Sequence, residues 1–323
     1  MSMSKDEFIG YIIASLSPDY RVSVTDVQKV GGGYTGLVIK GLNDGSDVDK
    51  GAVNTEVGAT FNLDELYKSY TESGKESIAE VADKIIQMFE NNKIEMSAVR
   101  GLKIDRDYIL ANVVERLSPV DKVPDKIFMD SYLDLAVVYS VRCNVGGSNG
   151  CFNLTKDHLN NFNISVDEIR EAARNNRSNR EFEIEPLWKI LSGMGFPAAL
   201  ADDTLYVASS KDKYFGASIM LDEKCFETFS DEKIDGGDFI VVPSSVHEVL
   251  CMKQPINTDN TKDIEKIIRS VNADVVAENE QLGDHPYIYC REKNCIMMPE
   301  DYLKLVEERN KEFEFDNTSR GAR

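Results

Sequence analysis

The sequence predicts an α+β fold in which a mixed or mostly antiparallel sheet is built from hairpins with amphipathic helices between them. Two observations carry this prediction. Short apolar runs of strand character occur in neighbouring pairs, joined by polar or glycine-containing turns. Longer segments with apolar residues three and four positions apart separate these pairs, without the regular strand–helix alternation of a parallel sheet.

The first hundred residues predict a helix, a hairpin, a short strand and two further helices. Residues 5–16 have the pattern of an amphipathic helix, and the glycines at 31–33 provide the turn between two alternating strands. Asn62 and Glu65 have capping-box spacing at the start of the second helix. Residues 76–90 repeat apolar side chains with a 3.6-residue period, which indicates the third helix.

The next two hundred residues predict most of the sheet. Strands are expected at residues 108–117, 132–141, 204–209, 214–221, 239–242, 247–252, 287–290 and 295–297. Helices are expected at residues 165–174 and 223–229, and around Ile264, Ile267, Ile268 and Val271, with a polar break at residues 174–180. Pro299, followed by two acidic residues, opens a last helix that is expected to end near Phe313.

This pattern divides the chain into three portions. Residues 1–100 form an N-terminal α+β portion, residues 101–298 form the main sheet, and residues 299–323 form a helix with a frayed tail. No proline- or glycine-rich linker marks the first boundary.

Charge and composition exclude several classes of protein. The 323 residues include 56 acidic and 37 basic ones, a formal net charge of −19, and 42% are hydrophobic. Such a chain can bury a core and is too acidic for a plain nucleic-acid binder. Its first residues do not have the pattern expected of a signal peptide, no apolar stretch reaches membrane-spanning length, and its six cysteines form no CxxC pair. We therefore expect a cytoplasmic protein with reduced thiols and no contact with membranes or nucleic acid.

Common enzyme motifs are absent from the sequence. It contains no P-loop, no dinucleotide-binding glycine motif, no nucleophile elbow and no zinc-protease motif. Only three histidines occur, at positions 158, 247 and 285. We therefore expect neither a bound cofactor nor a metal ion.

The segment around Ser245, His247 and Glu248 is the first candidate for catalysis, since it places a hydroxyl, an imidazole and a carboxylate between two apolar strands. Residues two apart on a strand are poorly placed for a serine–histidine hydrogen bond, so a structural turn is the simpler interpretation.

Asp284 and His285 are the second candidate. Together with His247 and Glu248 they could form a two-histidine, one-carboxylate metal site, but a capped turn before Pro286 is preferred.

Three further features are candidates for binding. Asp134 interrupts an apolar segment that predicts a central strand, where a carboxylate needs a partner such as Arg116 or Arg142. A basic cluster is expected in a solvated loop that could contact phosphate, and it contains Arg174, Arg177 and Arg180. Residues 201–300 contain 20 acids and 10 bases, so an acidic surface is expected over residues 202–238, beginning at Asp202 and Asp203.

Five segments together resemble an uncharacterised domain-of-unknown-function family that is common in clostridial gut anaerobes. They are residues 132–141, 153–176, 205–227, 241–252 and 284–289. The resemblance covers roughly residues 5–298. It implies a cytoplasmic globular protein and brings no activity, substrate, cofactor or catalytic residue with it.

Three functions therefore remain open. The leading hypothesis is a non-enzymatic interaction or regulatory module that binds another protein, with an association sensitive to salt. The second is an enzyme of unrecognised type with a Ser/His/Asp pocket. The third is an acidic nucleic-acid mimic or inhibitor from a mobile element, which requires rows of carboxylates at phosphate-like spacing.

Overall fold

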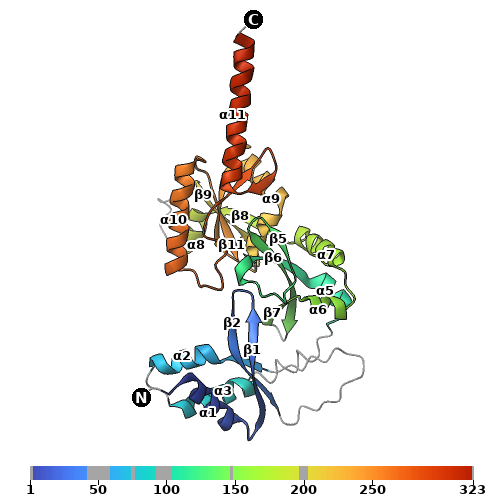
Figure 1. Cartoon of the computed structure of the whole chain (residues 1–323), viewed down its shortest axis with the longest axis vertical. Helices are drawn as coiled ribbons and strands as arrows, with labels where there is room; N and C mark the ends of the chain where they lie inside the picture. Colours follow the sequence, from blue (N-terminus) through green and yellow to red (C-terminus); the bar gives the residue numbers. More distant parts are fainter. Residues whose placement is uncertain are drawn as a thin grey trace. The chain divides into compact units, whose positions relative to one another are not determined.

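The computed structural model of the chain is shown in Figure 1. It describes residues 3–41, 59–73, 77–91, 104–145, 148–195 and 203–321. Helices and antiparallel strand pairs both occur throughout these ranges, which confirms the predicted α+β class. The chain divides into two compact units: unit 1 comprises residues 1–108 and 142–151, and unit 2 comprises residues 109–141 and 152–323.

Unit 1 packs helices against a three-stranded sheet of order β1-β2-β3. Its elements are α1 (Lys5–Leu16), β1 (Tyr20–Lys29), β2 (Gly32–Gly41), β3 (Ala59–Asn62), α2 (Leu63–Ser73) and α3 (Ile78–Asn91). Ser4 and Glu7 form a reciprocal capping box at the start of α1. One core joins the helices to the sheet, because Phe8, Leu37 and Ile85 are all fully buried in it.

Unit 2 contains most of the remaining elements. In chain order they are β4 (Val113–Pro119), η1 (Val120–Lys122), β5 (Met129–Tyr132), α6 (Lys156–Asn161), α7 (Val166–Ser178), β8 (Phe182–Pro186), α8 (Leu187–Gly193), β9 (Leu205–Ser210), η3 (Gly216–Leu221), α9 (Glu223–Lys233), β10 (Phe239–Ser245), β11 (Glu248–Met252), α10 (Thr258–Asp274), β12 (Tyr287–Cys290), β13 (Cys295–Met297) and α11 (Pro299–Gly321). Three further elements include residues of both units: α5 (Arg106–Asn112), β6 (Leu135–Val145) and β7 (Ser148–Asn153).

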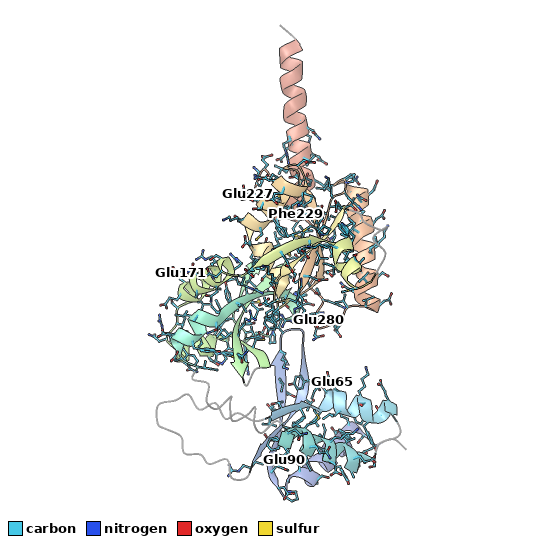
Figure 2. All side chains as sticks on the ribbon, turned by 180° about the vertical axis from the view of Figure 1, so that it is seen from behind. Glu65, Glu90, Glu171, Glu227, Phe229 and Glu280 are labelled. Atoms are coloured by element: carbon cyan, nitrogen blue, oxygen red, sulfur yellow. The ribbon has the colours of Figure 1, made fainter. Side chains whose placement is uncertain are left out.

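A six-stranded antiparallel sheet of order β13-β12-β10-β11-β9-β8 forms the centre of unit 2. Alternate side chains of a strand point to opposite faces. Ile240 therefore contributes to a core that lies under α10 and α11, together with Ile264 and Ile268 of α10. Phe239 points to the other face, where it contacts Phe229 of α9. Figure 2 shows Phe229 turned toward the sheet, while Glu227 of the same helix lies near the surface.

A smaller sheet of order β4-β6-β5, with β7 paired to β6, is linked to the large sheet by the short 3₁₀ helix η3. Residues Gly216–Met220 are buried, and η3 contacts β4 of the small sheet as well as β9 and β11 of the large one. The Ala217 amide donates to the Val246 carbonyl (3.4 Å), and Tyr132 of β5 donates its hydroxyl hydrogen to the Met220 carbonyl (2.8 Å). Within unit 2, η3 is therefore a buried connection between the two sheets.

The last helix, α11, has 23 residues and is about 34 Å long at 1.5 Å per residue. It extends away from the large sheet (Figure 1). Its base is fixed by Tyr302, which is buried and donates a hydrogen bond of 2.6 Å to Asp238. The other oxygen of Asp238 accepts the Arg291 amide at 2.7 Å. None of the described helices combines the length and the apolar composition that crossing a bilayer requires.

Most local predictions are confirmed, but three are wrong. Residues 214–221 are not a strand: Phe215 has a left-handed backbone (φ 49°) that turns the chain into η3, which occupies residues 216–221. The break predicted at residues 174–180 begins only after Ser178, since α7 continues to that residue. Asp134 lies in the turn between β5 and β6, next to the left-handed Leu133 (φ 54°), and not inside a strand.

Two boundaries also differ from expectation. The strand expected from residue 108 begins only at Val113, since α5 occupies the preceding residues. The last helix continues to Gly321, beyond the expected end near Phe313.

We expect Gly216→Ala to destabilise unit 2 by about 1–3 kcal/mol or more, the cost of overpacking a dense interior. A Cβ at this position would lie 2.2 Å from the His247 carbonyl oxygen and 2.7 Å from the Ser210 nitrogen. The measurement is the free energy of unfolding in urea. Gly193→Ala in α8 is the matched control, because nothing lies within 4 Å of its Cβ. Equal stability of the two variants would contradict the role of η3.

Candidate functional site

Asp134 and His285, which the sequence singled out separately, contact each other in unit 2. His285 Nε2 lies 2.8 Å from Asp134 Oδ2, and the Tyr287 hydroxyl donates to Asp134 Oδ1 at 2.8 Å. His285 Nδ1 lies 2.9 Å from the Pro286 carbonyl oxygen. This cluster joins the turn between β5 and β6 to the start of β12, so the partner of Asp134 is a histidine and not Arg116 or Arg142.

Both ring nitrogens of His285 face acceptors, which favours the doubly protonated imidazolium. Burial lowers the pKa of His285, but the Pro286 carbonyl and the Asp134 carboxylate raise it more, and the pKa lies above its ordinary value. Burial raises the pKa of Asp134, while hydrogen bonds from His285 and Tyr287 lower it to a net value below the ordinary one. Since both ring nitrogens of His285 already face acceptors within the protein, neither is left to exchange a proton with a substrate.

The segment from Ser244 to Glu248 comprises the end of β10, the turn of residues 246–247 and the first residue of β11, and the strand register shifts between Pro243 and Ser245. Ser245 does not hydrogen-bond the His247 ring; its hydroxyl oxygen accepts the His247 backbone amide at 3.1 Å. Ser244 donates to the Glu248 carboxylate at 3.3 Å. These contacts are those of a serine-containing turn.

The His247 ring packs beside η3. Its Nδ1 accepts the Phe215 backbone amide at 3.3 Å, and the two rings stack with centroids 5.9 Å apart. Because Nδ1 is an acceptor, the neutral ring carries its proton on Nε2 and can donate from that atom but cannot accept there. The Arg116 guanidinium carbon lies 5.0 Å from the centroid of the Phe215 ring.

The basic cluster is largely internal. Arg177 reaches both carboxylate oxygens of Glu115 at 2.7 Å, and both side chains are buried or nearly so. Arg180 donates to the Ser218 hydroxyl at 3.0 Å and forms an ion pair with Asp212 at 3.2 Å. The Arg174 side chain donates to the carbonyl of the preceding helical turn. A role of these arginines in binding phosphate stays a prediction.

The remaining candidate acids have local partners or lie outside the described residues. Asp284 forms an ion pair with Arg269 at 3.2 Å, and its charge adds to those of the groups that raise the pKa of the neighbouring His285. Asp203 accepts the Trp188 indole N–H at 2.8 Å. Asp202 is outside the described residues. In the described part of the chain, no group of three or more His, Cys, Asp and Glu side chains could hold a metal ion.

One surface feature was not recognised as a site from the sequence. Ile264 and Ile268 of α10 are buried, as expected, but Ile267 is 62% exposed and Val271 is 43% exposed. Val275, at the end of the helix, is 78% exposed. These three residues are four positions apart and so form one apolar stripe along α10. The sequence of α10 does contain a signal for this stripe, because the helix has more apolar positions than one buried face can accommodate.

The sequence pattern of the family described as "Family of unknown function (DUF5688)" matches residues 5–291. No curated protein and no solved structure matches the chain. The expectation of a domain of unknown function is thereby confirmed, while its distribution among clostridial anaerobes stays a prediction.

His285 is expected to stabilise unit 2 at low pH. Its folded pKa lies above the unfolded value of 6.5, so the stabilisation is complete below pH 6.5 and is lost as pH rises through the folded pKa. His285→Gln should remove this loss from the pH dependence of the unfolding free energy.

His158→Gln is the matched control, because burial lowers the pKa of His158. The stability that His158 contributes is present above pH 6.5 and is lost on acidification. Glutamine also suits its capping-box position. An unchanged slope above pH 6.5 in His285→Gln would contradict the assignment.

We expect Arg177→Met to cost about 3–5 kcal/mol of unfolding free energy, because it leaves the buried Glu115 carboxylate without its cation. Burial raises the pKa of Glu115 even beside Arg177. The double variant Glu115→Gln/Arg177→Met should be more stable than the single one in chemical denaturation. A double variant that loses as much as both single variants summed would show that the two side chains are not coupled.

Proposed function

The chain belongs to the family of unknown function DUF5688, and we propose that it binds another protein through the outer face of α10. The observation that carries the proposal is the exposed stripe of Ile267, Val271 and Val275. Single exposed apolar residues are common on proteins, but β-branched side chains aligned over two helical turns form a continuous apolar surface. Such a stripe can pack against an amphipathic helix of a partner.

The charges beside the stripe favour a partner with basic flanks. Asp263 is four residues before Ile267, and Asp274 is three residues after Val271, so both carboxylates lie along the stripe. Lys266 and Arg269 form ion pairs with acids, through Asp263 (2.8 Å) in the first case and through Glu265 and Asp284 in the second. Among the described residues, Asp274 has no ion pair. Lysine or arginine beside the apolar stripe of a partner helix would complement this arrangement.

The contacts of the candidate catalytic residues also support binding rather than catalysis. His285 has both ring nitrogens occupied, and the neutral His247 ring can offer only a donor at Nε2. Ser245 contacts a backbone amide and not a general base. A polar side chain whose hydrogen-bonding atoms already have partners within the protein is a poor candidate for proton transfer to a substrate.

The proposal is tested with a fluorescently labelled peptide of leucine and lysine arranged as an amphipathic helix of about five turns. A peptide of the same composition in scrambled order controls for charge alone. In anisotropy titrations, the patterned peptide should bind more tightly than the scrambled one. The affinity should fall when ionic strength rises from about 0.01 M to about 1 M, since the screening length shrinks from about 30 Å to about 3 Å.

Two double variants locate the surface. Ile267→Gln/Val275→Gln should weaken binding more than tenfold, about 1.4 kcal/mol. The control Val24→Gln/Met88→Gln changes two exposed apolar residues of unit 1 and should bind as the wild type does. Surface substitutions of this kind change stability by about 0.5 kcal/mol or less, so folding is preserved. Equal weakening by both variants, or no preference for the patterned peptide, would overturn the proposal.

A further inference from the structure

Cys290 and Cys295 are direct partners across the β12–β13 hairpin. They form the last residue pair of the antiparallel register, and the loop of residues 291–294 connects them directly. Directly opposed residues of an antiparallel pair have Cα atoms about 4.5 Å or about 5.5 Å apart and point to the same face. Disulfides span Cα separations of about 4.4–6.8 Å, so both Cα geometries lie within the range of a disulfide.

The hairpin holds this pair in place. Asn294 has a left-handed backbone (φ 48°), and its side chain accepts the Tyr289 hydroxyl at 2.7 Å. The Arg291 amide donates to Asp238 at 2.7 Å, and the Arg291 side chain reaches Asp231 at 2.9 Å. The loop therefore has contacts on both sides, and the opposed positions of the two thiols do not depend on a mobile turn.

The two thiols differ in access. Both are free, but Cys290 is fully buried in the core beneath α10 and α11, whereas Cys295 is partly exposed. A reagent from solution therefore reaches Cys295 first, and the buried Cys290 is the thiol that resolves the product. A reversible dithiol site requires one thiol that the reagent can reach and a second thiol, shielded from the reagent, that displaces it.

We propose that Cys290 and Cys295 form a reversible oxidation site that closes to an intramolecular disulfide by exchange with a low-molecular-weight disulfide. The Cys295 thiolate attacks one sulfur of the reagent and releases one thiolate. Cys290 then loses its proton and attacks the Cys295 sulfur of the mixed disulfide, which releases the second thiolate. Two protein thiols are oxidised to one disulfide, and one reagent disulfide is reduced to two thiols.

The rate of closure should depend on pH, because only the thiolate attacks. Burial raises the pKa of Cys295, and the neighbouring Cys290 and Glu223 raise it further. Exchange should therefore be slow near neutral pH and faster in alkaline solution.

The test uses the full chain, reduced and then incubated with glutathione disulfide at several pH values. Free thiols are alkylated after acid quenching, and the protein is digested and examined by mass spectrometry. The expected product is a peptide linked between Cys290 and Cys295, lighter by two hydrogens, that returns to the dithiol with a reductant. Amide hydrogens of residues 287–297 should exchange more slowly in the oxidised form.

Variants separate this site from the other thiols. Cys295→Ser changes a partly exposed residue, should fold normally, and should abolish the linked peptide. Cys225→Ser, at a partly exposed cysteine of α9, should leave it unchanged. A stable glutathione adduct on Cys295, a link between Cys143 and Cys151 in place of the proposed one, or disulfide-linked dimers would each overturn the proposal.

Discussion

Gly216 brings the backbone of η3 so close to the His247 carbonyl oxygen and the Ser209 hydroxyl that no side chain fits between them. This close approach holds η3, the buried connection between the two sheets of unit 2, against the large sheet. Ser209 donates to the same carbonyl at 2.8 Å, and the left-handed Phe215 turns the chain into the gap. A bulky residue in this backbone conformation carries strain, which the burial of η3 on all sides offsets. The candidate residue His247 is therefore part of the packing that joins the sheets.

Hairpins and amphipathic helices were predictable because their signals are local. The pair β12 and β13 occurs where alternation and the polar loop predicted it, and α1 begins at its capping box. The segment of residues 214–221 was mistaken for a strand, because an apolar run that is buried on all sides has no periodicity to distinguish strand from helix. Residues 174–178 remain helical because Arg177 and Asn176 find partners on β4 and α5 that lie far away in the sequence.

The candidate site was predictable only as a set of separate residues. Asp134 and His285 each attracted attention, yet 151 positions separate them and no local pattern relates one to the other. The stripe of α10 illustrates a different limit. Periodicity shows that Ile264, Ile267 and Ile268 belong to a helix, but it cannot tell which of two adjacent stripes the sheet covers. Only the packed structure reveals that Ile267 faces outward.

The two oxygens of Asp238 give α11 a mechanical property. One oxygen holds the base of the helix through Tyr302, and the other holds the β12–β13 loop through the Arg291 amide. A helix about 34 Å long that is fixed near one end is a lever. A sideways load on its far end would be transmitted to the loop beside Cys290 and Cys295 through Asp238 and through the ion pair between Arg309 of α11 and Glu292 of the loop. Movement of α11 would therefore act on the hairpin that holds Cys290 and Cys295.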